Sequence, residues 1–215
     1  MITIQRFTFN LFEISSYVLS DETGEGVIID PGMSSEEEEK QLTDYIAAAR
    51  IKPVMMLLTH AHIDHIIGCF FTAGHYNLQL SAHKDCNKFI EQAKVSASTF
   101  GIRLRGVKNI DAFLKEGDEI KFGNSSLKVL HTPGHADGSV CYYSSENNFV
   151  ITGDVLFKDS IGRTDLPTGN FDLLQYNIWE KLFKLPDSTV VYPGHGPTTT
   201  IGSEKVNNPF VAIGL

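Results

Sequence analysis

The sequence has little positive charge and few cysteines. Its 215 residues include 18 Lys and Arg against 26 Asp and Glu, which gives a formal net charge of −8. This acidic balance argues against a nucleic-acid-binding surface, although a single catalytic pocket can still be locally positive. The three cysteines, Cys69, Cys86 and Cys141, are odd in number and widely spaced, so the sequence indicates neither a disulfide framework nor a CxxC metal pair. This usage fits a reducing compartment, and we expect a cytoplasmic protein.

Long apolar runs are also missing. The sequence has no stretch of about 18 apolar residues that would suit a membrane span, and no basic segment followed by an apolar one at its start, as a signal peptide would have. Linkers, repeats and low-complexity segments are absent as well. The composition, with 42% hydrophobic and 20% charged residues, is that of a globular protein with a sizeable core. We therefore expect a single domain over residues 1–215, with no membrane and no nucleic-acid partner.

The order of the predicted elements indicates an α/β fold with two sheets. Short strands at 2–10, 14–20 and 26–30 come first, and a helix follows the serine-capped acidic run at 34–39. The elements predicted after it are strands at 54–58, 78–82, 139–143, 148–152 and 190–192, short strands within 107–131, and helices at 66–76, 84–100, 171–184 and near Ser203. The two halves have similar make-up, and a mixed two-sheet core with helices outside covers both faces of each sheet.

The most informative segment is the sequence THAHIDH that follows the apolar strand at 54–58. It contains four metal-ligand types within six residues: His60, His62, Asp64 and His65. The carboxyl ends of such strands are where α/β proteins build their active sites. His60 and His62 are separated by one residue, so on an extended backbone their side chains point the same way, whereas the other two follow where the chain turns toward a helix. Imidazole and carboxylate together suit zinc, iron or manganese.

Three more strand ends carry potential ligands. His135 follows a Thr-Pro-Gly turn, Asp154 follows a glycine at the end of the strand at 148–152, and His195 follows a Pro-Gly turn after the strand at 190–192. Each of these alone is weak evidence, because a histidine after a turn is usually just solvated. Together with the first segment they place ligand types at four strand ends, and we expect those ends to converge on one cleft.

These residues suffice for two divalent metal ions. A hydrolytic metal site uses about three or four protein ligands and leaves a position open for water. We expect one set to consist of His60, His62 and His135, and the other of Asp64, His65 and His195, with the two oxygens of Asp154 bridging them. Two ions about 3.5–4 Å apart can share a hydroxide near neutral pH, because each ion lowers the pKa of bound water to about 7. We expect zinc, with iron or manganese as alternatives.

The same segments resemble the metallo-β-lactamase superfamily. The matching motifs stand in that family's order and span nearly the whole chain: His60-Ala61-His62-Ile63-Asp64-His65, Thr132-Pro133-Gly134-His135, Gly153-Asp154 and Pro193-Gly194-His195-Gly196. The resemblance implies a four-layer αββα sandwich, in which two mixed β-sheets are flanked by helices. Some penicillin-destroying members place a cysteine ligand where this chain has Asp154, so we expect no antibiotic hydrolysis.

Within the superfamily the chain looks most like short bacterial relatives of glyoxalase II, the hydroxyacylglutathione hydrolases. The likeness rests on three further segments: DVLF at 154–157, SIGRTDLP at 160–167, and TIGSE with NPF within 200–210. Full-length glyoxalase II adds a C-terminal helical domain whose basic residues help hold glutathione, whereas this sequence ends about ten residues past Glu204. We therefore expect a small thioester as substrate, with only a modest preference among thiols.

The resemblance implies a dinuclear metal-dependent hydrolase of thioesters such as S-lactoylglutathione or related acyl thiols. The metal-bridging hydroxide would attack the thioester carbonyl, and the metals, held by Asp64 and Asp154 among others, would stabilise the oxyanion. The nearest alternative is an oxidoreductase resembling the persulfide dioxygenases, which hold one iron with the equivalents of His60, His135 and Asp154. Hydrolysis of another small ester, a lactone or a phosphodiester, and a metal-stabilised binding module without chemistry, are further alternatives.

Three other residues have more than one interpretation. His131 lies four residues before His135 and could compete with it as a ligand. Because the family pattern favours His135, we expect His131 to support a ligand or the structure. Lys158 and Arg163 follow the third motif strand, at 148–152, and are the basic residues that we expect near an anionic substrate. For Arg163, an ion pair with a neighbouring aspartate that holds its loop is an equally good interpretation.

Overall fold

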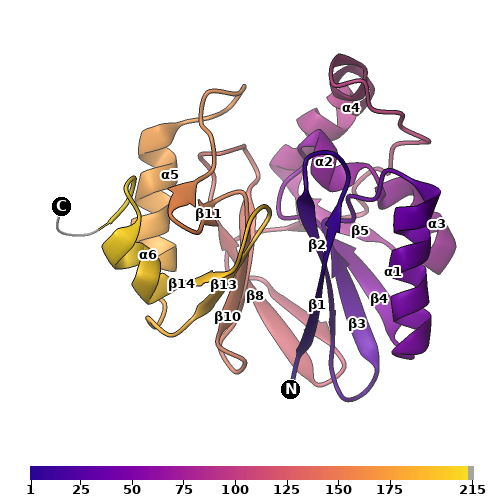
Figure 1. Ribbon diagram of the computed structural model, residues 1–215, viewed down its shortest axis with the longest axis horizontal. Helices are drawn as coiled ribbons and strands as arrows, with labels where there is room; N and C mark the ends of the chain where they lie inside the picture. The colour runs from indigo at the N-terminus through magenta and orange to yellow at the C-terminus, as the bar shows by residue number, and fades with distance from the viewer. Residues whose placement is uncertain (213–215) are drawn as a thin grey trace.

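The chain folds into two six-stranded sheets that pack face to face (Figure 1). The computed structural model describes residues 1–212, so the last three residues of the expected 1–215 domain lie outside the described part. The first sheet has the strand order β1 (Thr3–Phe9), β2 (Ile14–Ser20), β3 (Glu25–Ile29), β4 (Lys52–Leu57), β5 (Leu80–His83) and β6 (Ala112–Leu114). The second has the order β14 (Thr199–Thr200), β13 (Val190–Pro193), β10 (Phe149–Gly153), β9 (Val140–Ser144), β8 (Ser125–His131) and β7 (Glu119–Phe122). A small hairpin of β11 (Leu156–Phe157) and β12 (Ser160–Ile161) follows β10.

Helices cover the outer face of each sheet (Figure 1). Those of the first half are α1 (Glu36–Ala48), α2 (Ile63–Ile66), α3 (Cys69–Tyr76) and α4 (Asn87–Thr99), with a 3-10 turn, η1 (Lys84–Cys86). Those of the second half are α5 (Phe171–Asn177), the π-helical turn η2 (Ile178–Leu182) and α6 (Ile201–Asn207). None of the helices within residues 1–212 combines the length and the apolar character of a membrane span.

Three apolar clusters fill the spaces between the layers. One lies between the first sheet and its helices, one between the two sheets, and one between the second sheet and the helices at its outer face. Tyr17 and Tyr142 are the largest side chains buried between the sheets. The predicted four-layer αββα sandwich with two mixed sheets is therefore confirmed.

The predicted helix at 66–76 begins only at Cys69, as α3, and the separate short helix α2 ends at Ile66, with Gly68 in the break between them. The amide of Gly68 donates to the carbonyl oxygen of Pro31 at 2.8 Å, and a Cβ at this glycine would lie 2.7 Å from that oxygen. The close approach of the two backbones thus requires glycine. Because the contact joins residues far apart in the sequence, helical periodicity did not indicate the break.

Strand direction places the four motif segments at one edge of the sandwich. Strands β4 and β5 are parallel, β10 and β13 are parallel, and β8 runs parallel to β10 because both are antiparallel to β9. Hydrogen bonds join the two sheets near that edge: Val140 N to Thr59 O at 2.8 Å, Ser15 N to Gly194 O at 2.7 Å, Tyr142 Oη to Leu58 O at 2.5 Å and Tyr17 Oη to Pro193 O at 2.6 Å. These bonds fix the carboxyl ends of strands from both sheets relative to one another.

Candidate metal centre

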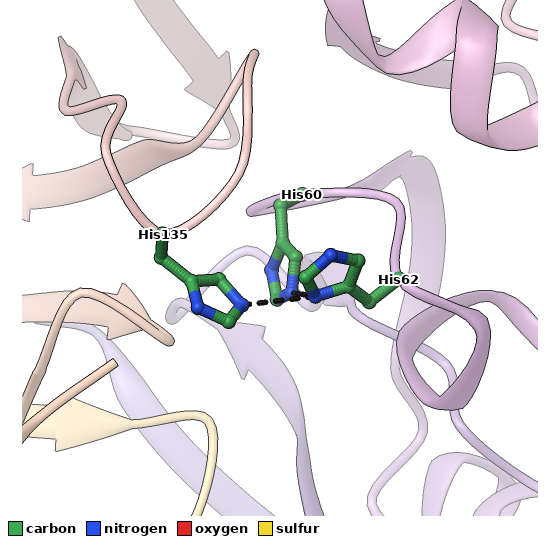
Figure 2. A group of neighbouring side chains, drawn as sticks. All are labelled: His60, His62 and His135. Atoms are coloured by element: carbon green, nitrogen blue, oxygen red, sulfur yellow. Dashed lines mark hydrogen bonds between the residues drawn. The ribbon is translucent and has the colours of Figure 1, made fainter. Parts of the chain in front are cut away.

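Three imidazole rings meet where β4 and β8 end (Figure 2). Nε2 of His60 lies 3.1 Å from Nδ1 of His62, and Nε2 of His135 lies 2.9 Å from the same His62 atom. Burial lowers the pKa of all three rings, and the His135 ring also helps to lower the pKa of His62 to about 4. The three rings are therefore neutral at pH 7, and each turns a ring nitrogen toward its neighbours.

A second triad lies beside the first and contains Asp64, His65 and His195. The first two residues belong to α2, and His195 follows β13. Oδ2 of Asp64 lies 3.2 Å from Nε2 of His195 and 3.7 Å from Nε2 of His65. Burial alone would lower the pKa of His65, but the carboxylates of Asp64 and Asp154 raise it well above its usual value. The two carboxylates thus create a negative potential at the His65 ring, which favours a proton there and would equally favour a metal cation.

Asp154 lies between the two triads. Its Oδ1 atom is 3.4 Å from Nε2 of His65, and its Oδ2 atom is 3.7 Å from Nε2 of His135 and 3.6 Å from Nε2 of His195. Burial would raise the pKa of this carboxyl, but His65 and His195 hold it far below its usual range. One ionised carboxylate therefore faces rings of both triads, as the expected bridging position requires.

The donor set fits divalent metal ions. Nε2 of His65 and Oδ1 of Asp154 are buried 3.4 Å apart, and neither forms a hydrogen bond among residues 1–212, which is costly for polar atoms. The neutral nitrogens of the first triad face one another at 2.9–3.1 Å, close to the roughly 3.4 Å that separates ligand atoms around a tetrahedral ion. A cation in each triad would satisfy these atoms. The two groups of His and Asp residues therefore indicate a dinuclear metal site.

Several rings are oriented by acceptors that the sequence analysis did not identify. The Nδ1 contacts are His65 to Oδ2 of Asp30 at 3.0 Å, His135 to the carbonyl of Arg163 at 2.8 Å, and His195 to the carbonyl of Phe12 at 2.9 Å. A carbonyl or carboxylate oxygen only accepts, so each ring donates through Nδ1 and turns Nε2 toward the site, where a bound metal ion would take the place of any proton on that nitrogen. Asp30 left a signal in the sequence, as a carboxylate directly after a buried strand; backbone carbonyls leave none.

The remaining sequence candidates lie outside both triads. The guanidinium of Arg163 donates to both oxygens of Asp165, at 2.8 and 2.7 Å, and the side chain is 62% exposed. Arg163 therefore forms the ion pair with a neighbouring aspartate that the sequence analysis gave as one interpretation. It contacts the site through its backbone carbonyl, which accepts from Nδ1 of His135. Lys158 is exposed, and its side chain makes no hydrogen bond within the described residues. The ring of His131 stacks on that of His83 with the centroids 4.1 Å apart, so it does not compete with His135.

Comparison with known proteins agrees with this geometry. The sequence model of the metallo-beta-lactamase superfamily matches residues 10–195. The chain belongs to this superfamily. It is 33% identical to the hydroxyacylglutathione hydrolase GloC of Haemophilus influenzae, with 98% of each chain covered. It is 37% identical to the probable metallo-hydrolase YqgX of Bacillus subtilis, with 91% of this chain and 90% of the relative covered. Membership supports a metal-dependent hydrolase.

Solved structures show the same sandwich. The crystal structure of BLEG-1 B3 metallo-beta-lactamase has a TM-score of 0.89 and 34% identity, covering 97% of this chain and 99% of that one. TTHA1623 in a di-iron-bound form has a TM-score of 0.85 and 33% identity, covering 96% and 99%. ETHE1 from Myxococcus xanthus has a TM-score of 0.79 and 28% identity, covering 98% and 84%. One similar protein thus binds two irons, and the identity of the metal is a separate question from the number of sites.

Proposed function

We propose that this chain is a dinuclear metal-dependent hydrolase of small thioesters, with S-lactoylglutathione or a related acyl thiol as substrate. The observation that carries the proposal is the pair of complete triads with Asp154 between them. The similarity to GloC, which is described as a hydroxyacylglutathione hydrolase, supports the choice of a thioester. That relative is matched over 98% of its length, so the length of the present chain does not argue against glutathione as the thiol.

Zinc is the proposed metal, because neutral imidazole and carboxylate are its usual ligands, and iron is the alternative. When bound, two divalent ions supply a nucleophile near neutral pH and polarise the substrate carbonyl. The chain's own residues set the geometry of the centre. His60, His62 and His135 would hold one ion, Asp64, His65 and His195 the other, and Asp154 would fix their separation. A thiolate leaves readily, so the reaction needs no strong general acid at the site.

An apolar rim adjoins the second triad on the solvent side. His195 is 28% exposed, and its Nδ1 donates to the carbonyl of Phe12 in the turn between β1 and β2. The centroid of the Phe157 ring lies 6.3 Å from that of the His195 ring. Leu11, which precedes Phe12 in the same turn, is almost fully exposed. We propose that these side chains contact the acyl or thiol part of the substrate. Lys158, next to Phe157, is the proposed contact for an anionic group; Arg163 would first have to leave Asp165.

Oxygen chemistry and β-lactam hydrolysis are the two competing proposals. A one-iron dioxygenase would need His60, His135 and Asp154 but would have no use for a complete second triad, which favours hydrolysis. The similarity to BLEG-1, described as a B3 metallo-beta-lactamase, favours testing β-lactams although the sequence argued against them.

The deciding experiment supplies zinc-loaded and iron-loaded protein with S-lactoylglutathione, glutathione persulfide and a chromogenic cephalosporin in parallel. Thioester loss that follows two metal equivalents is the expected result, and His195→Ala should abolish it while the exposed His75→Ala should not. Oxygen uptake with the persulfide and no thioester loss would replace the proposal with the dioxygenase. Cephalosporin turnover faster than thioester turnover would replace it with the lactamase.

The choice of thiol is tested by a KM series on one acyl group. The same lactoyl group would be carried by glutathione, coenzyme A and a short thiol. Because the chain has net charge −8 and few basic side chains near the site, we expect a high KM and modest differences among the three thiols. A low KM for glutathione alone would show that the domain contains a thiol site of its own.

A further inference from the structure

A third group of ligand-type side chains lies apart from the two triads. It contains His83, which ends β5 in the first sheet, His131, which ends β8 in the second, and Asp85 in η1. One ligand atom of each residue lies within 4.8 Å of the other two. The two rings are nearly parallel, with an interplanar angle of 11° and 4.1 Å between centroids. Two imidazoles from different sheets are thus stacked face to face, with a carboxylate close to a nitrogen edge of the His83 ring.

The polar atoms of this group are poorly satisfied by the protein itself. Nε2 of His131 is buried and has no hydrogen-bond partner among residues 1–212. His83 is 7% exposed, and its Nδ1 accepts only a long hydrogen bond of 3.3 Å from the amide of Asp85. A buried ring nitrogen without a partner costs free energy, so simple stacking leaves this arrangement unexplained.

Both rings are suited to a cation at neutral pH. Burial lowers the pKa of His83 and of His131, and the His83 ring lowers the pKa of His131 further. Neutral rings keep a lone pair that a metal can accept. Oδ2 of Asp85 lies 3.5 Å from Nδ1 of His83 and adds a negative charge. The positive charge of Lys181 would repel a cation near His131, but its ammonium forms an ion pair with Glu116 at 2.6 Å, which offsets that charge.

We propose that His83, Asp85 and His131 form a third metal site, which binds one divalent d-block cation such as Zn²⁺. Two imidazole nitrogens, one carboxylate oxygen and water complete a four-coordinate shell. Ligand atoms around such an ion are about 3.4 Å apart. Nδ1 of His83 and Oδ2 of Asp85 are already 3.5 Å apart, and the stacked rings would tilt so that their in-plane lone pairs meet at the ion. The carboxylate of Asp85 is 45% exposed and has room to follow this movement.

The ion would connect the two sheets at the edge that carries the dinuclear centre. Its ligands come from β5 and η1 on one side and from β8 on the other. The turn that carries His135 begins directly after His131, so a cation here also holds the base of that turn. Because the unfolded chain does not bring these residues together, binding stabilises the folded state by an amount that grows with the logarithm of the free metal concentration.

The first test counts metal in untagged protein equilibrated with excess zinc and then freed of unbound metal. We expect wild-type protein to retain one equivalent more than Asp85→Asn or His131→Asn, and its Tm to rise further with added zinc. The exposed His75→Asn is the matched control and should behave as wild type. Equal retention by wild-type protein and Asp85→Asn would overturn the proposal. If His131→Asn folds poorly, Asp85→Asn still decides the result, because its side chain is half-exposed.

The second test locates the ion. Anomalous diffraction at the zinc edge from zinc-soaked crystals should show a peak at the nitrogen edges of the His83 and His131 rings, beside the Asp85 carboxylate, which is lost in Asp85→Asn. Peaks confined to the two triads would overturn the proposal. Neither test uses turnover, so failure of the proposed thioesterase activity, or occupancy of only one triad, leaves the outcome readable.

Discussion

The buried carboxylate of Asp30 accepts a hydrogen bond from Nδ1 of His65, with 3.0 Å between that nitrogen and Oδ2. The same carboxylate accepts from the amide and the hydroxyl of Thr59, at 2.7 and 2.5 Å. Asp30 follows β3, whereas its partners follow β4 or belong to α2. One side chain of the first sheet thus anchors the start of the THAHIDH segment and directs a ring of the second triad toward the site.

Asp30→Asn should weaken metal binding without removing any proposed ligand. The carboxylate accepts from the amide and hydroxyl of Thr59 and from Nδ1 of His65. An amide would turn its NH2 group toward at least one of these three donors, so the His65 ring loses its fixed orientation. Loss of such an outer partner typically costs 10–100-fold in metal affinity or activity. Metal affinity measured by competition with a chelator would check this. Asp21→Asn, which changes another buried acceptor far from the triads, is the matched control and should keep wild-type affinity.

Asp154→Ala should be more damaging than Asp30→Asn. Its carboxylate faces rings of both triads, so its removal should lower the occupancy of both and reduce kcat by more than about 100-fold, beyond the range of an outer partner. Elemental analysis at saturating zinc, carried out in an Asp85→Asn background so that only the triads are counted, should find about two ions with Asp154 intact and fewer than one in Asp154→Ala. The exposed Asp172→Asn serves as the control. Full occupancy of both triads in Asp154→Ala would show that this residue does not bridge.

Gly194→Ala should disturb the centre by a purely steric route. A Cβ at position 194 would lie 2.1 Å from Oδ1 of Asp154 and 3.1 Å from Cε1 of His65. The carboxylate must therefore move, and overpacking of this kind costs about 1–3 kcal/mol of stability. We expect reduced metal content and activity. Gly74→Ala in α3 is the control, since its Cβ would meet nothing within 4 Å, and it should keep its metal and gain up to about 1 kcal/mol.

Asp21 should make stability depend on pH at the end of the sandwich away from the metal centre. Burial would raise the pKa of Asp21, but hydrogen bonds from Thr23 and from the amide of Asn124 hold it below its usual value. A depressed pKa in the folded state contributes stability above the ordinary pKa of about 3.9, and that contribution is lost as the pH falls through the folded-state value.

Denaturant unfolding of metal-free protein would measure this effect. Asp21→Asn should be less stable than wild type by about 1–3 kcal/mol at pH 7, because hydrogen bonds to a charged acceptor are lost. The difference should shrink as the pH falls below about 4. Asp44→Asn, on the exposed face of α1, should show no comparable trend. A gap between Asp21→Asn and wild type that stays constant down to acid pH would contradict the explanation.

Much of the fold and of the candidate site followed from local patterns. Apolar strands, each ended by a turn and a ligand-type residue, predicted the strand ends after β4, β8, β10 and β13, and the family motifs gave their order. The αββα sandwich and the superfamily are confirmed. The break at Gly68 and the short strand β14 were missed, because a backbone contact with Pro31 causes the first, and β14 has only two residues, which pair with β13.

The sequence by itself determined which residues have side chains suited to metal binding at strand ends, since the type of side chain and its place after a strand are local properties. Only the tertiary structure decided how they group. Distances of about 3 Å between ring nitrogens depend on strand direction and on hydrogen bonds that join the two sheets. The carbonyls of Phe12 and Arg163 act through atoms that every residue has, so no side chain marks them. The pairing of His83 with His131 depends on the meeting of β5 and β8, strands of different sheets, and no sequence spacing encodes it.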